Sequence, residues 1–164
     1  MNLAAHGIAA QLPTGWEGSI ASEQQELVEA QTHAFSTGDR SAQILPVAHF
    51  ATVGLPAGRD DFGSTVVGDL GPDDVFVSLL EYAPEEANSA LFSQEGLPRR
   101  LDPREFSPRM LQRMMRGQSG LQLFFNDGGR AFCLYIVLGS ADDAHRLVRR
   151  VEQVLATVQI EEQT

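Results

Sequence analysis

The chain has 164 residues, 43% of them hydrophobic and 21% charged, which indicates a soluble globular protein with a core large enough to fold without staples. The formal net charge is −10, which argues against non-specific nucleic-acid binding through the whole surface. The single cysteine excludes an intramolecular disulfide.

The first residues contain neither a basic segment nor a long apolar stretch, so we expect no signal peptide, no membrane insertion and a cytoplasmic location. A strand is predicted for residues 7–12, a turn for residues 13–15, and a second short strand for residues 16–21. Ser22 with Gln25 resembles a capping box for a helix over residues 23–35. The polar character of that stretch suits a mobile loop almost equally well.

The middle of the chain alternates short apolar runs with turn residues. A strand is predicted for residues 42–53, where Pro46 indicates an edge position or a bulge. Residues 61–69 are expected to form one or two helical turns, and residues 75–82 a strong strand. The remaining expectations here are a short helix over residues 84–92, an extended run over residues 96–103, and a helix that begins at Ser107-Pro108 and ends near Gly117.

The last third carries the clearest signals. Two apolar runs, residues 121–125 and 130–138, flank an Asn-Asp-Gly-Gly turn, a pattern that predicts a β-hairpin whose second strand is buried on both faces. Ser140 stands at a capping-box-like start of a helix over residues 141–156 with one aliphatic face. Strands and helices do not alternate regularly along the chain. We therefore predict a single α+β domain over residues 1–164, with helices packed on an antiparallel sheet.

Two segments resemble the PsbP-like family, which includes LpqN-type bacterial proteins. Residues 7–16, GIAAQLPTGW, are similar to that family's opening strand and its Pro-x-Gly-Trp turn. The closing hairpin and helix, ending in residues 154–160, are similar to its last helix and return strand. The resemblance covers roughly a third of the chain and rests on structural motifs. It implies an α/β/α sandwich and a mostly non-enzymatic family of binding, assembly and chaperone proteins, and it supplies no catalytic residues. Many members carry a signal or lipoprotein peptide, which is not evident in this sequence.

The usual carriers of catalysis give no site in this sequence. Cys133 lies in the most apolar strand and is interpreted as a small buried hydrophobe. The four histidines have no zinc-ligand spacing, and His49, within an apolar strand, is interpreted as a packed, hydrogen-bonded residue. No phosphate loop, GxSxG elbow or dinucleotide fingerprint is present. We therefore predict no catalytic residue, no metal and no cofactor.

One basic stretch stands out against the acidic background. Residues 99–116 hold six Arg and two acids, whereas residues 1–95 have a net charge of −12. A solvated face is the simpler interpretation. A recognition surface is the alternative, because Arg beside Met is over-used at adaptable binding surfaces. The residues proposed to bind a partner are Arg99, Arg100, Arg109, Met110, Arg113, Met114 and Arg116.

These observations favour a non-catalytic protein-binding or assembly protein, chaperone-like, whose partner is another protein of acidic character. Two alternatives remain open. One is a small hydrolase or small-molecule-binding protein with a pocket between sheet and helix. The other is a homo-oligomeric structural component of a larger particle. A deep pocket with convergent His, Asp and Arg would favour the hydrolase, and a shallow apolar groove rimmed by Arg would favour the protein-binding function.

Overall fold

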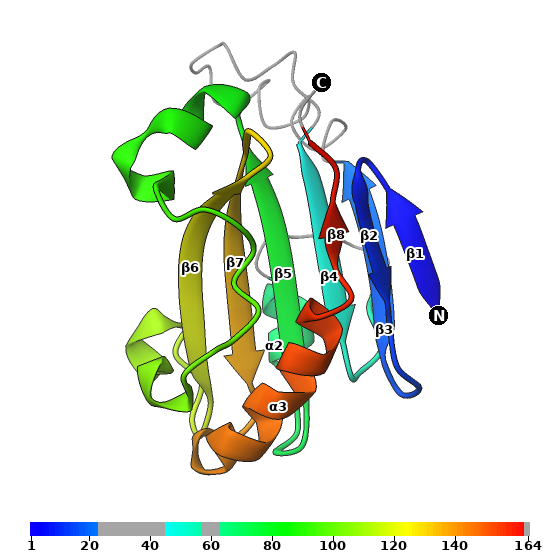
Figure 1. The fold of residues 1–164 in the computed structure, drawn as a ribbon. Helices are drawn as coiled ribbons and strands as arrows, with labels where there is room; N and C mark the ends of the chain where they lie inside the picture. Colours follow the sequence, from blue (N-terminus) through cyan, green and yellow to red (C-terminus); the bar gives the residue numbers. More distant parts are fainter. Residues whose placement is uncertain (23–44, 57–62, 163–164) are drawn as a thin grey trace, which may run out of the picture.

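The computed structural model describes residues 1–22, 45–56 and 63–162, and within them the chain forms two antiparallel sheets with a few helices (Figure 1). The larger sheet has the strand order β3-β4-β5-β7-β6, and the smaller one β1-β2-β8. The strands are β1 (Asn2–Ala5), β2 (Ile8–Gln11), β3 (Glu17–Ser22), β4 (Pro46–Ala51), β5 (Val75–Tyr82), β6 (Ser119–Asp127), β7 (Arg130–Leu138) and β8 (Gln159–Ile160). The α+β class with an antiparallel sheet is confirmed.

The helical elements are short, apart from the last. The α-helices of the described residues are α2 (Ser64–Val67) and α3 (Ala144–Leu155). The 3₁₀ turns are η2 (Pro84–Asn88), η3 (Ala90–Phe92), η4 (Pro103–Glu105), η5 (Pro108–Met110) and η6 (Ala141–Asp143). The prediction for residues 23–35 lies outside the described residues.

The β6–β7 hairpin forms as predicted. Its two-residue turn is Gly128-Gly129, and both residues have a positive φ, 59° and 83°. Glycine adopts both conformations without strain, and the resulting twist matches that of the strands. Every residue of β7 is buried, and β7 pairs with β5 on one side and β6 on the other. The prediction of a strand buried on both faces is therefore confirmed.

One face of the larger sheet, here called the helix face, carries the main core. Phe132, Leu134, Ile136 and Leu138 of β7 point to this side, and α3 and the smaller sheet cover it together (Figure 1). The aliphatic residues that α3 buries are Leu147, Val148, Val151, Val154 and Leu155. Their burial contributes on the order of 7–15 kcal/mol before chain entropy is subtracted. The predicted helix and its apolar face are confirmed, although Ser140 makes no side-chain cap.

The opposite face has a thinner cover. Cys133, Tyr135 and Val137 of β7 point to this side, where Val66 and Val67 of the single-turn helix α2 pack against it. Leu111 and Met115, from the segment before β6, pack there as well. The helical turn predicted within residues 61–69 is therefore confirmed over Ser64–Val67.

Several expectations require correction. Pro46 is not at an edge, because β4 lies between β3 and β5; it is the first residue of its strand, where a missing N–H costs little. The helix expected after Ser107 stops at Met110, because Leu111 already has an extended ψ of 141°. The helix expected over residues 84–92 consists of two 3₁₀ turns, η2 and η3. Strand β1 was not predicted at all.

Candidate functional site

The basic stretch belongs to a segment that wraps around one edge of the larger sheet. Residues 97–118 are called the edge segment below. Its first part, up to Phe106, runs in front of β6 and β7 on the helix face, where Leu101 and Phe106 pack against the main core (Figure 1). Ser107 then pairs with Gly120 at the rim of β6. After this bridge the segment continues on the opposite face, where Leu111 packs beside Tyr135. The edge segment therefore touches both faces of the sheet.

Arg99 fixes the first part of the edge segment to α3. Its guanidinium donates to the carbonyl of Leu155 and, at 2.9 Å, to the carbonyl of Val158. Leu155 is the last residue of α3, and Val158 lies between the helix and β8. A cation at this helix end also interacts favourably with the helix dipole. The backbone N–H of Leu101 donates to Glu152 Oε2 at 2.8 Å. The guanidinium of Arg99, which was predicted to bind a partner, therefore forms hydrogen bonds within the fold.

Arg104 is committed to a local contact. Its side chain and backbone both donate to the Asp102 carboxylate, with Nη2 at 3.1 Å from Oδ2. These hydrogen bonds from Arg104 hold the pKa of Asp102 below its usual value. The Arg104 side chain is 84% exposed, so the pair adds little to stability. It shapes η4 and removes one Arg from the positive charge that a partner would meet.

The second part of the edge segment leaves its other arginines free of ion pairs. Ser107 Oγ accepts from the N–H of Arg109 at 3.1 Å, and Tyr135 Oη accepts from the N–H of Gln112 at 2.8 Å. At the far end Gln118 donates to the Val67 carbonyl of α2 at 2.9 Å. Among the described residues no carboxylate pairs with the following exposed side chains: Arg100, Arg109, Arg113 and Arg116.

In a helix after Ser107, the spacing of Met110, Met114 and Met115 would place them on one face, but the chain is not helical beyond Met110 and the three side chains differ in exposure. Met115 packs inward and Met110 is half-buried, but Met114 is 72% exposed. The structure therefore brings an exposed apolar side chain and three arginines, none of them paired with a carboxylate of the described residues, into the eight residues 109–116. Both ends of this stretch lie at the start of β6, since Ser107 bridges Gly120 and residue 118 directly precedes Ser119.

A buried ion pair was missed by the sequence analysis. Arg130 faces Glu81 with both guanidinium edges engaged, Nη2–Oε1 at 2.6 Å and Nε–Oε2 at 2.9 Å, and each side chain is 8% exposed. The remaining N–H groups of Arg130 donate to the carbonyls of His6, Gly7 and Glu161. All five guanidinium donors are thus used. The sequence feature that could have predicted this pair is a charged residue in each of two apolar strands: Arg130 is the first residue of β7, and Glu81 lies near the end of β5.

A row of polar side chains also went unnoticed. Five residues that are register partners on successive strands share the opposite face: Ser19, His49, Ser78, Tyr135 and Gln122. Burial raises the pKa of Tyr135, and it raises the pKa of the adjacent Cys133 to about 12. His49 contacts Phe76 edge-on, with ring centroids 5.1 Å apart. The row contains no carboxylate, so it lacks the third member of a Ser-His-Asp arrangement.

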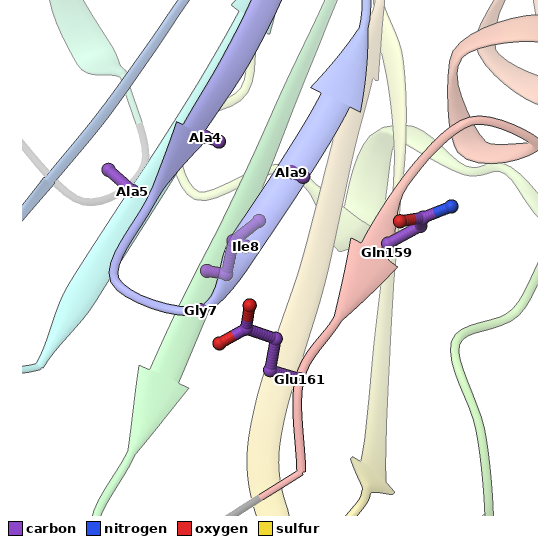
Figure 2. A pocket seen from close by; sticks show the side chains of 7 residues that line it. All are labelled: Ala4, Ala5, Gly7, Ile8, Ala9, Gln159 and Glu161. Atoms are coloured by element: carbon purple, nitrogen blue, oxygen red, sulfur yellow. The ribbon is translucent and has the colours of Figure 1, made fainter.

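A hollow of about 270 Å³ lies on the smaller sheet, and Figure 2 shows the side chains that line it. Its lining residues are Ala4, Ala5, Gly7, Ile8, Ala9, Gln159 and Glu161. Most of them are small and apolar, and one is a carboxylate. Because no His or Arg side chain converges on it, the hollow does not have the features that would favour a hydrolase.

No protein-family model, curated protein or solved structure matches this chain. Within residues 1–22, 45–56 and 63–162, no three His, Cys, Asp or Glu side chains are grouped to hold a metal ion. No helix in this part of the chain is long and apolar enough to cross a membrane. Function is therefore inferred from the geometry of the chain itself.

Proposed function

We propose that the protein is a non-catalytic binding or assembly protein that recognises an acidic segment of another protein through the edge segment. The observation that carries this proposal is the set of Arg109, Arg113 and Arg116, which are exposed and unpaired among the described residues beside the exposed Met114. An arginine fork can bind a carboxylate through two parallel hydrogen bonds. In a chain of net charge −10, such a local patch is a specific target for carboxylates.

The anchoring of the edge segment adds to this proposal. Leu111 is buried, Gln112 is tied to Tyr135, and Gln118 is tied to α2. Both ends of this stretch are held before any partner arrives, so binding would require less ordering than a free loop would. Met114 supplies an adaptable apolar contact next to the charges.

The resemblance to the PsbP-like family is consistent with the same proposal. That family is mostly non-enzymatic, and an α/β/α sandwich is its expected architecture. The helix face, covered by α3, fits that expectation. We propose membership on the strength of residues 7–16 and 154–160, and we take no residue role from it.

The test is an affinity pull-down from the native host, read by mass spectrometry. Arg109→Glu with Arg113→Glu should lose the acidic partner at least about tenfold, because charge reversal replaces attraction by repulsion. Arg149→Glu is the control, since Arg149 is exposed on α3, far from the edge segment in sequence. Retention of every partner by a folded double variant would show that the patch is an ordinary solvated surface.

A further inference from the structure

The rim of β6 is an open strand edge over a short window. Gly120 exchanges backbone hydrogen bonds with Ser107, at 2.9 and 3.1 Å, so its N–H and C=O point outward from the sheet. Asn126 also points outward, since its N–H donates to Gln94 and its carbonyl accepts from Gly96. Backbone groups alternate along a strand, so those of Gln122 and Phe124 point outward too. No described residue hydrogen-bonds to these four groups.

The two ends of the window limit what can occupy it. Ser107 and Glu95 already form isolated β-bridges with Gly120 and Asn126, in the position that a next strand would take. Gly120 and Asn126 are six residues apart, roughly 20 Å along the strand. A second copy of β6 would need nine residues of room to pair fully, and its ends would collide with both bridging segments. The window therefore fits a short extended segment of three or four residues.

The window has opposite charges at its two ends. Arg109, Arg113 and Arg116 lie in the segment that begins and ends beside the start of β6, at the Gly120 end. Glu95 forms the bridge at the Asn126 end and is exposed. A strand that pairs antiparallel to β6 runs from the Asn126 end to the Gly120 end. Acidic residues that follow its paired part would therefore reach the arginines.

We infer that the partner binds by strand addition: an extended segment pairs antiparallel with the backbone of Gln122 and Phe124, and its following carboxylates meet Arg109, Arg113 and Arg116. This inference rests on the proposed function and states how the acidic segment is held. Two residues of the partner exchange both backbone hydrogen bonds with β6, and this pairing tolerates many side chains. The half-buried Leu123 and Phe124, on opposite faces, supply apolar contacts beside the added strand.

The probe is a blocked peptide with four β-branched residues followed by three glutamates, titrated into the isotope-labelled full chain and followed by NMR. We expect the amide signals of Gln122 and Phe124 to shift, and their hydrogen exchange to slow about tenfold at saturation. A peptide with the glutamates first, and one methylated on every amide of its β-branched part, are the matched controls. Both should bind about tenfold more weakly, the first by misplacing the charges and the second by losing backbone donors.

Two variants test the same pairing from the side of the protein. Gln122→Pro removes an outward N–H without touching the ladder to β7, and Gln122→Val keeps that N–H. The proline variant should bind the probe about tenfold more weakly than the valine variant. Should the proline variant not fold, the methylated peptide on the unchanged protein still decides the question.

The outcomes separate the two proposals. Equal binding of all three peptides, abolished by Arg109→Glu with Arg113→Glu, would overturn strand addition and leave acidic recognition standing. Failure of every peptide to bind at millimolar concentration would also overturn strand addition, because backbone pairing depends little on sequence. The proposed function would then depend on the pull-down alone.

Discussion

Phe132 and Cys133 are neighbours in β7, yet each is fully buried on a different face of the sheet. Phe132 stacks on Phe125 across the hairpin, with ring centroids 5.4 Å apart, and the Arg130 guanidinium lies 5.2 Å from its ring centroid. Cys133 packs with Val47 and Leu80 on the other face, and Tyr82 and Phe124 lie beside this cluster. These two neighbouring side chains show that both faces of β7 are covered by other residues.

Phe132→Ala is expected to lower the free energy of unfolding by about 3–5 kcal/mol, since it empties a fully buried ring site in the main core. Urea denaturation followed by circular dichroism measures the change. Met114→Ala is the control, because Met114 is 72% exposed and should change stability by less than about 0.5 kcal/mol. A cost below about 1 kcal/mol for the Phe132 variant would contradict the central position of β7.

Cys133 should resist thiol reagents in the native protein at pH 8. Burial raises the pKa of this thiol to about 12, from an ordinary value of 9.0, so almost no thiolate forms and access is blocked. Labelling should become fast only in denaturant. Because the folded-state pKa is the higher one, this group's contribution to stability is present below pH 9 and is lost as the pH rises toward about 12. Fast labelling without denaturant would show that the strand opens.

At the scale of elements, the sequence predicts those helices and strands whose residues have a clear local pattern. The hairpin and α3 were predicted because turn glycines and a 3.6-residue apolar period leave few alternatives. The helix expected after Ser107 had a comparable period but failed, because tertiary contacts outweigh it. Tyr135 Oη accepts a hydrogen bond from the N–H of Gln112, and Leu111 packs on Gly120. Together these two contacts hold the chain extended.

Other features of the fold have no local sequence pattern from which they could be predicted. Strand β1 has a weak β-forming sequence, and it forms because β2 pairs with it along its whole length. The polar row from Ser19 to Gln122 exists only through the register of five strands, so no single strand reveals it. The contacts of Arg99, one of the predicted partner-binding residues, also have no local signal. Its acceptors, at the end of α3 and just after it, are 56 and 59 residues away in sequence.

Gly120 is the position where the edge segment meets the sheet most closely. A Cβ there would lie 2.7 Å from Leu111 Cδ2 and 3.1 Å from the Ile136 carbonyl oxygen. Gly120→Ala should therefore push Leu111 off β6 and cost about 1–3 kcal/mol. Limited trypsin digestion should cut faster after Arg113 and Arg116, because the loosened chain fits the protease better. In Gly54→Ala, whose Cβ would meet Glu17 Oε2 at 3.9 Å and no other atom of the described residues within 4 Å, cleavage should be unchanged.

At the scale of the whole molecule, Arg130 joins the two sheets. Its Glu81 partner belongs to β5 of the larger sheet, whereas the carbonyls of His6 and Gly7 form the β1–β2 turn and that of Glu161 follows β8. These contacts span up to 124 residues of sequence. The smaller sheet is therefore attached to the larger one by a buried charge as well as by apolar packing.

Arg130→Met should cost about 3–5 kcal/mol, because it leaves the Glu81 carboxylate buried without its partner and removes the guanidinium donors from three carbonyls. Adding Glu81→Leu to Arg130→Met should restore part of the lost stability, since no uncompensated charge remains.

Hydrogen exchange gives the second measurement. In Arg130→Met the amides of β1, β2 and β8 should exchange faster, with those at the centre of β5 least affected. Arg146→Met, which breaks an exposed 2.7 Å pair with Asp73, is the control and should cost less than about 1 kcal/mol. Uniform acceleration across both sheets would mean that Arg130 supports global stability only, and that the smaller sheet is held by its apolar contacts.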